Sequence, residues 1–213
     1  MQRMFVTGIG TGVGKTIVSA IITEALHADY WKPVQTGSGE GTDSETVRSL
    51  LTNKDSVIHP EAYSLKLPAS PHAAAAEEGI IIQMRNLKAP STKNMLVIEG
   101  AGGLMVPLND KELMIDLVQH FNAVVVLVVR HYLGSINHTL LSLQALKQKG
   151  IKVIGIVYSG NPNEQSEKAI ESFSHCPVVG RVSEEKAFSP SVILRYAKEF
   201  QQSMLAEVVV KKK

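Results

Sequence analysis

The sequence predicts an α/β fold in which a doubly wound, mostly parallel sheet is flanked by helices. Short apolar runs recur along the 213-residue chain, and several are apolar on both faces, as in strands buried between two layers. Segments with helical spacing lie between these runs, and the alternation is typical of parallel strands joined by crossover helices. Ligands of such sheets bind beyond the carboxyl ends of the strands, so we expect the site in the strand-to-helix loops.

The spacing of apolar residues indicates where the elements lie. The expected strands cover residues 4–6, 30–34, 95–98, 123–129 and 153–158, with a weaker one at 177–179. Helical spacing covers residues 17–26 and 136–148, and Gly150 is suited to ending the second helix. A further helix is expected to have Ser70 as its cap and Pro71 as its first residue. The stretch 37–42, rich in Gly, Ser and Thr, is expected to be a mobile loop.

Composition limits the kind of protein. With 44% hydrophobic and 20% charged residues the chain resembles soluble α/β enzymes, and its net charge of +2 is too small to indicate nucleic acid binding. It has one cysteine and no apolar stretch long enough to span a bilayer, which favours a cytoplasmic protein without a membrane partner. We expect one domain over residues 1–213, with a disordered tail from about residue 208 that includes Lys211, Lys212 and Lys213.

A glycine-rich loop lies between the first strand and the first helix, at residues 7–16. Its glycines allow successive N–H groups to face one anion, and the helix start adds its positive dipole end. Lys15 supplies a charge for terminal phosphates, and Thr16 is placed to offer a hydroxyl to Mg²⁺. Because Ile9 stands where the first glycine is usual and Gly8 lies one position further out, we predict a P-loop variant with one extra residue. The alternative is a glycine-rich turn that only packs a helix against a sheet.

Two carboxylates are candidate metal ligands. Glu99 ends the third strand and is followed by four small residues, so an acid stands where ligands of such sheets bind. Its alternative role is to cap the N–H groups of the next segment. Asp43 precedes a helix and is therefore either an ordinary N-cap or a second carboxylate of the site.

Two further positions have open interpretations. Lys32 follows the second strand and is either a surface lysine or one that faces the P-loop. The N–H groups at the helix start near Ser135 either hold a carboxylate or are capped by Ser135 itself. The sequence shows neither an HExxH cluster nor a GxSxG motif, so zinc catalysis and acyl-enzyme chemistry are not expected.

Five segments taken together resemble the dethiobiotin synthetase family, which adds the P-loop NTPase type to the predicted fold. They are residues 8–16, Lys-Pro-Val-Gln-Thr-Gly at 32–37, Ser-Pro-His at 70–72, Glu-Gly-Ala-Gly-Gly at 99–103 and Leu-Gly-Ser-Ile-Asn-His at 133–138. The resemblance implies a ligase of biotin biosynthesis that makes dethiobiotin, ADP and phosphate from 7,8-diaminononanoate, CO₂ and ATP with Mg²⁺. One amine traps CO₂ as a carbamate, the γ-phosphate activates it as a mixed anhydride, and the second amine closes the cyclic urea.

The resemblance also implies roles for individual residues. The catalytic residues would be Lys15, Lys32 and Thr11. ATP would be bound by Gly12, Val13, Gly14, Lys15, Thr16, Ser159 and Asn161, and Mg²⁺ by Thr16, Asp43 and Glu99. The substrate would be bound by Thr36, Pro71, Gly102, Leu133, Gly134, Ser135 and Asn137. The family places the helix start at Ser135 in the neighbouring subunit's site, which implies a homodimer.

Some residues of this chain depart from the pattern of the dethiobiotin synthetase family. Gly12 stands where some relatives have an acid. The adenine-reading segments differ, because Asn161 lies further from the fifth strand than usual and residues 180–183 read Gly-Arg-Val-Ser, so base selectivity stays open.

Three other classes compete. A switch ATPase would usually have another lysine early in the loop, and residues 9–13 contain none. An amidoligase of the cobyrinic acid type would need a longer chain with a nucleophilic cysteine. A module that only binds nucleotide would require a decayed site, whereas every charged position is filled.

Overall fold

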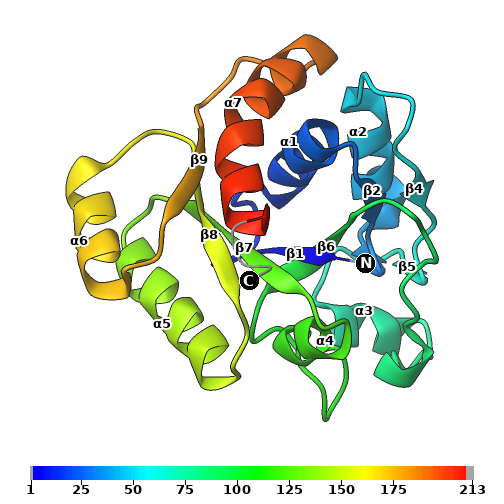
Figure 1. The fold of residues 1–213 in the computed structure, drawn as a ribbon. Helices are drawn as coiled ribbons and strands as arrows, with labels where there is room; N and C mark the ends of the chain where they lie inside the picture. Colours follow the sequence, from blue (N-terminus) through cyan, green and yellow to red (C-terminus); the bar gives the residue numbers. More distant parts are fainter. Residues whose placement is uncertain (1, 210–213) are drawn as a thin grey trace.

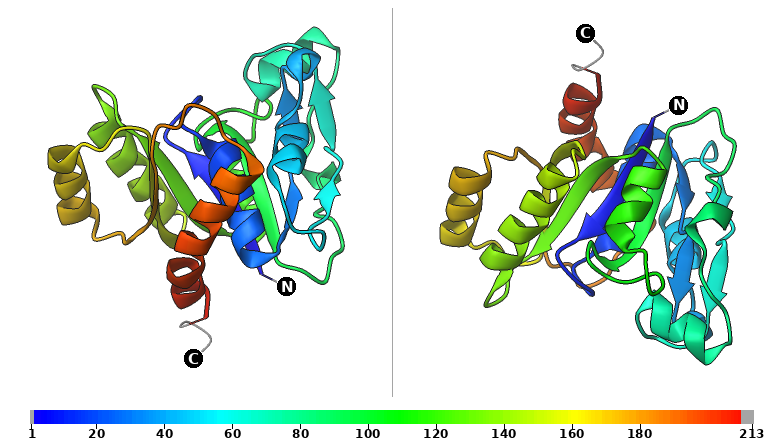
Figure 2. Two further views of the ribbon diagram at one scale, coloured as in Figure 1. Left: turned by 90° about the horizontal axis from the view of Figure 1, so that it is seen from above. Right: turned by 90° about the horizontal axis from the view of Figure 1, so that it is seen from below.

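The computed structural model describes residues 2–209 and contains a seven-stranded sheet with helices on both faces (Figures 1 and 2). The strand order is β4-β2-β6-β1-β7-β8-β9, and all neighbouring strands are parallel. The predicted doubly wound fold is confirmed. The strands are β1 (Arg3–Gly8), β2 (Asp29–Trp31), β4 (Ile58–His59), β6 (Leu96–Gly103), β7 (Val124–Arg130), β8 (Val153–Ser159) and β9 (Val178–Val182).

Helices cover the sheet in two layers. α1 and α7 pack on one face, and α4 and α5 pack on the other (Figure 2). Successive residues of a strand point to opposite layers, so Met4 and Val6 of β1 pack in the α1 layer while Phe5 packs in the α4 layer. The helices are α1 (Lys15–Leu26), α2 (Asp43–Leu50), α3 (Pro71–Glu77), α4 (Met114–His120), α5 (Ser135–Gln148), α6 (Glu164–Ser174) and α7 (Pro190–Val209), with short 3₁₀ turns at Ser38–Glu40 and Met84–Asn86.

The single strand expected at residues 30–34 is wrong, because the chain forms two strands there. β2 ends at Trp31, and β3 (Val34–Thr36) pairs with β5 (Tyr63–Leu65) in a separate two-stranded sheet. Pro33 lies between them and has no N–H to donate, and its carbonyl accepts the N–H groups of Ala62 and Tyr63. The break places Lys32 at the carboxyl end of β2.

Two other boundaries differ from expectation. β6 continues through Gly103, although the four small residues after Glu99 were expected to leave the strand. Gly100 is needed within it, because a Cβ there would lie 2.7 Å from the Phe5 ring. Residues 208 and 209 were expected in the tail but end α7, while Lys211, Lys212 and Lys213 lie outside the described residues. Within residues 2–209, no helix is long and apolar enough to cross a membrane.

Candidate active site

The P-loop joins β1 to α1 at the carboxyl edge of the sheet. Gly14 caps α1 with a φ of 94°, and a Cβ there would lie 2.6 Å from the Ser159 hydroxyl. Gly8 is needed for a different reason, since a Cβ on it would lie 2.4 Å from a methyl group of Val13, whose side chain is buried under the loop. These two contacts explain why glycine stands at both positions of the unusual spacing.

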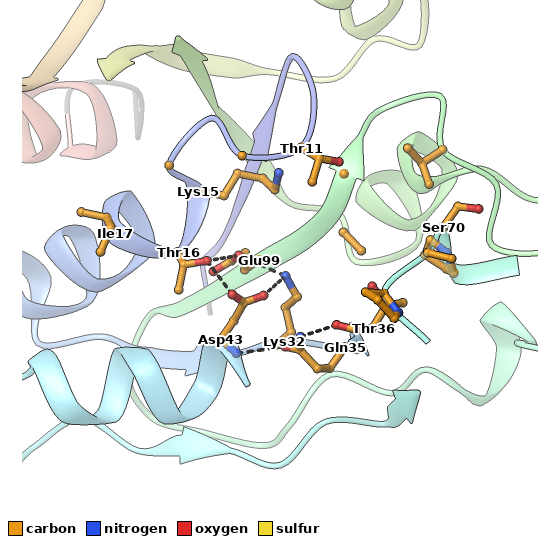
Figure 3. A pocket seen from close by; sticks show the side chains of 18 residues that line it. Thr11, Lys15, Thr16, Ile17, Lys32, Gln35, Thr36, Asp43, Ser70 and Glu99 are labelled. Atoms are coloured by element: carbon orange, nitrogen blue, oxygen red, sulfur yellow. Dashed lines mark hydrogen bonds and ion pairs between the residues drawn. The ribbon is translucent and has the colours of Figure 1, made fainter. Parts of the chain in front are cut away.

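A cavity of about 700 Å³ opens beside this loop (Figure 3). Its walls come from segments far apart in the sequence, which meet because the carboxyl ends of parallel strands share one edge of the sheet. The predicted site residues that line it are Thr11, Gly12, Gly14, Lys15, Thr16, Lys32, Thr36, Asp43, Pro71, Glu99 and Gly102.

A cluster of charges lies at the centre of the cavity (Figure 3). Lys32 Nζ lies 2.6 Å from Asp43 Oδ2 and 3.0 Å from Glu99 Oε1. The Thr16 hydroxyl lies within hydrogen-bond distance of the same two carboxylates, 2.7 Å from Asp43 Oδ1 and 3.0 Å from Glu99 Oε1. A hydroxyl and two carboxylates are hard oxygen donors of the kind that Mg²⁺ prefers, and they lie beside the loop that would carry phosphates.

The two lysines of the cavity differ in their electrostatic surroundings. Burial disfavours the charge on Lys32, but Glu99 and Asp43 raise its pKa above the usual value, so its ammonium stays charged. Burial likewise opposes the charge on Asp43, yet Lys32 and Thr16 lower the pKa of this carboxyl. For Lys15, burial and repulsion by Lys32 lower the pKa to about 8. Its ammonium donates to the neutral carbonyl of Gly10 at 2.8 Å, so a bound anion would stabilise its charge.

The structure decides between several alternatives left open by the sequence. Asp43 is the first residue of α2 rather than its cap, because Thr42 holds the cap position and accepts the N–H of Glu45. The Asp43 and Glu99 carboxylates both line the cavity. Lys32 is buried and is not a surface lysine.

Of two expected helix caps, the position of Ser70 before Pro71 is confirmed and that of Ser135 is not. Ser70 holds the cap position of α3 but its side chain makes no capping bond, and its hydroxyl pairs with His72 Nδ1 instead. In α5 the cap residue is Gly134, and Ser135 is the first residue of the helix. Capping by Ser135 is therefore wrong.

Sequence reasoning gave no role to Gln35, which lines the cavity, or to Tyr30, which contacts a residue that lines it. Gln35 lines the cavity, accepts the N–H of Asp43 at 3.0 Å and donates to the Thr36 carbonyl at 2.7 Å. The Tyr30 hydroxyl donates to Glu99 Oε2 at 2.9 Å, and burial together with Glu99 raises the Tyr30 pKa well above its usual value. The sequence did contain a signal for these two roles. Tyr30 and Gln35 are polar residues on either side of Lys32, in a segment otherwise suited to a buried strand.

The other predicted residues lie outside this cavity. Leu133, Gly134 and Asn137 line a second cavity of about 660 Å³ at the starts of α5 and α6, and Ser135 is buried next to them. Ser159 lies against Gly14 at the end of β8, and Asn161 is exposed in the loop that follows. One chain therefore does not bring the start of α5 to the P-loop cavity.

The fold and the glycine-rich loop define a P-loop protein that uses a nucleotide. An AAA domain family matches residues 2–192. The ATP-dependent dethiobiotin synthetase BioD of Christiangramia forsetii is 54% identical over 203 residues, covering 95% of this chain and 98% of that protein. The corresponding protein of Cytophaga hutchinsonii is 52% identical over 198 residues, covering 92% of this chain and 96% of that protein. The chain belongs to the dethiobiotin synthetase family, and the predicted class, an ATP-dependent ligase of biotin biosynthesis, is confirmed.

Solved structures of lower identity share the fold. A ParA family ATPase from Chlorobium tepidum has a TM-score of 0.59 at 13% identity, over 99% of both chains. MinD from Pyrococcus horikoshii, complexed with Mg-ADP, has a TM-score of 0.58 at 15% identity, over 99% of this chain and 96% of MinD. Identities this low show the common fold alone, so they lend no support to a switch ATPase.

Proposed function

We propose that this chain forms dethiobiotin from 7,8-diaminononanoate, CO₂ and ATP in the P-loop cavity, with release of ADP and phosphate. The observation that carries the proposal is the convergence of two ammonium groups, two carboxylates and a helix start in one cavity. Phosphorylation of a carbamate requires positioning and neutralisation of charge rather than a covalent nucleophile. These groups are suited to both tasks.

The phosphates of ATP are proposed to bind at the start of α1, from Gly12 to Thr16, where free N–H groups and the helix dipole favour an anion. Lys15 would exchange its neutral partner, the Gly10 carbonyl, for phosphate oxygens. The Lys15 ammonium would then face anionic oxygens instead of a neutral one, so this exchange is favourable. Ser159 ends β8 and Asn161 follows it on the same edge of the sheet, and both are proposed to contact the nucleotide towards its base.

The donors in the cavity fit Mg²⁺. The Thr16 hydroxyl lies within 3.0 Å of an oxygen of Asp43 and of Glu99, and Mg²⁺ is usually held by one or two carboxylates with water and phosphate oxygens. These three residues would hold the ion, which when bound supplies positive charge to the phosphate oxygens. Lys32 pairs with the same carboxylates in the free protein, and together with Lys15 it gives two positive charges against two negative ones before any ligand binds.

The reaction consists of three covalent steps. One amine of the substrate adds to CO₂ and loses a proton, which gives a carbamate. A carbamate oxygen attacks the γ-phosphorus and ADP leaves. The second amine then attacks the carbamoyl carbon, loses a proton and expels phosphate. Lys32 and Lys15, with the hydroxyl of Thr11, are proposed to hold the carbamate and phosphoryl oxygens, because charge develops there in each step.

The diamine is proposed to lie against Thr36, Pro71 and Gly102, which line the same cavity. Gly12 offers no carboxylate to the amines, so their protons would pass to water, to the substrate or to carbonyl groups.

A second copy of the chain is proposed to complete the substrate site. The start of α5, with Leu133, Gly134, Ser135 and Asn137, would bind the substrate carboxylate in the neighbour's cavity. Exposed apolar side chains support an interface there: Leu133 is fully exposed, and Met105 and Leu141 are more than half exposed beside a surface groove.

The activity is tested with purified protein, MgATP and bicarbonate, with and without 7,8-diaminononanoate. Phosphate release is measured by a coupled assay, and dethiobiotin is measured by mass spectrometry. We expect phosphate release to depend on the diamine and to match dethiobiotin in amount. Phosphate release that is independent of the diamine would contradict the proposal.

A further inference from the structure

The two carboxylate oxygens of Glu99 have different hydrogen-bond partners. Oε1 faces the cavity, where Lys32 and the Thr16 hydroxyl each lie 3.0 Å away. Oε2 accepts the Tyr30 hydroxyl at 2.9 Å. Tyr30 is fully buried, and Glu99 is 1% exposed, so water has little access to either oxygen.

We propose that Tyr30 is a positioning residue for Glu99: its hydroxyl fixes the carboxylate so that Oε1 faces the metal and the phosphates. The inference rests on the proposed function, because it assigns Glu99 to a magnesium site. Tyr30 is not one of the residues that line the cavity, so it would contact neither the metal ion nor the phosphates.

The backbone supports this role. β2 and β6 are neighbouring parallel strands, with Tyr30 in register with Val97, two residues before Glu99. The backbones that carry Tyr30 and Glu99 are therefore fixed relative to each other in one sheet. A hydrogen bond to the outer oxygen of a ligating carboxylate orients the ligand, and such outer contacts are usually worth 10- to 100-fold in metal affinity or activity.

Without the hydroxyl, Glu99 Oε2 would be buried without a donor, which is costly for a charged group. The carboxylate would then rotate towards the donors that remain, Lys32 and Thr16, and both oxygens would compete for them. Ligand geometry at Oε1 would be lost, while the loop that binds the phosphates would be unchanged.

The test is the dissociation constant of ADP measured by calorimetry, once with Mg²⁺ and once with EDTA. The ratio of the two constants is the gain in affinity that Mg²⁺ supplies. In Tyr30→Phe we expect this gain to fall about tenfold or more, with ADP affinity in EDTA unchanged within about twofold. The matched control is Tyr158→Phe, since the Tyr158 hydroxyl is buried and makes no hydrogen bond to any residue within 2–209. Tyr158→Phe should keep the wild-type gain.

Several outcomes would overturn the inference. An unchanged gain in Tyr30→Phe would do so, as would an equal loss with Mg²⁺ and with EDTA, which a merely structural role would produce. If the wild-type protein itself shows no gain in ADP affinity from Mg²⁺, the magnesium site fails and the inference about Tyr30 fails with it. If wild type shows the gain and Tyr30→Phe keeps it, only the inference about Tyr30 fails.

A second measurement uses Glu99→Gln, which removes the carboxylate charge that Tyr30 is inferred to orient. Adding Tyr30→Phe to Glu99→Gln should change the Mg²⁺ gain by less than about twofold, because effects that act through one group are not additive. Full additivity of the two substitutions would contradict the inference. Tyr30→Phe keeps the aromatic ring and its apolar contacts, and circular dichroism checks that each variant folds.

Discussion

At the scale of single residues, the site depends on charges that are buried together. Lys32 and Glu99 expose 5% and 1% of their side chains, and Lys32 also donates to the Gly100 carbonyl at 3.3 Å. Removing one member of such a pair leaves a charge that has lost both water and its partner. The same residues are therefore expected to affect both stability and activity.

Replacing Lys32 with methionine is expected to lower the free energy of unfolding by about 3–5 kcal/mol in EDTA, because Asp43 and Glu99 then lack a counter-charge. Part of the lost stability should return when MgCl₂ is added, because Mg²⁺ would supply positive charge to the same two carboxylates. Urea unfolding in the two buffers measures both effects. Lys149→Met, which breaks a partly exposed pair with Asp116, is the control and should cost no more than about 1 kcal/mol. Equal losses in the two variants would contradict the role of Lys32.

Replacing Lys15 with alanine is expected to lower ATP turnover at least about 100-fold, since an ammonium aimed at the transferring phosphate is lost. The fold should remain, because the Lys15 ammonium donates to the neutral carbonyl of Gly10 in the free protein. Removing it therefore leaves a neutral acceptor without its donor, and not a charge. Phosphate release and urea unfolding measure the two quantities. Lys168→Ala, which removes an exposed lysine paired with Glu164, should retain activity. Full activity in Lys15→Ala would refute the P-loop assignment.

At the scale of elements, the strongest patterns predicted most of what positions the site. β1, α1, β7, α5 and β8 lie close to their expected places, because long apolar runs and helical spacing are local properties of the chain. α4, α6 and α7 were not predicted, although the buried residues Ile193, Ala197 and Phe200 of α7 follow helical spacing. Pro33 is a local signal against one continuous strand, but the pairing of β3 with β5 is a contact between distant segments that a local pattern does not contain.

The contact between α1 and the segment after α2 gives a prediction about pH. The Glu24 carboxylate accepts the N–H and hydroxyl of Thr52 and the N–H and side-chain amide of Asn53. Burial raises the pKa of Glu24, but these hydrogen bonds outweigh it and lower the pKa below 4.5. A lowered pKa in the folded state means that the stabilisation is present above pH 4.5 and is lost as pH falls through the folded-state pKa.

Accordingly, Glu24→Gln is expected to cost about 1.5–3 kcal/mol at pH 7, the usual range for hydrogen bonds to a charged group. The difference from wild type should shrink as pH falls below 4.5. Urea unfolding between pH 3 and pH 7, about the range in which carboxylates titrate, measures it. A difference that stays constant over this range would contradict the account.

At the scale of the whole molecule, the predicted site residues form two separate groups in one chain. The sequence motifs predicted residues of both groups, but sequence order does not say which of them meet in space. The P-loop, Lys32, Asp43 and Glu99 meet because their strands end at one edge of the sheet. The start of α5 opens into a different cavity, so its proposed role in binding the substrate would require a second subunit.

Mixed dimers test that requirement. Lys15→Ala alters the P-loop cavity and Asn137→Ala alters the start of α5, so each variant alone should be nearly inactive. If a site combines both parts from different subunits, a mixed dimer contains one intact site. Co-expressed variants should then recover about a quarter of wild-type activity, because half of randomly formed dimers are mixed and each has one intact site of two. Activity no higher than that of either variant alone would contradict a shared site.

In the proposed reaction, ATP drives ring closure by phosphorylating a carbamate in the P-loop cavity. The most direct measurement is a short incubation of the protein with ¹⁸O-labelled bicarbonate, the diamine and MgATP, followed by mass spectrometry of the phosphate. Because a carbamate oxygen attacks phosphorus and leaves with it, we predict that each phosphate released with dethiobiotin carries one ¹⁸O atom. Phosphate without ¹⁸O, formed alongside dethiobiotin, would contradict the account.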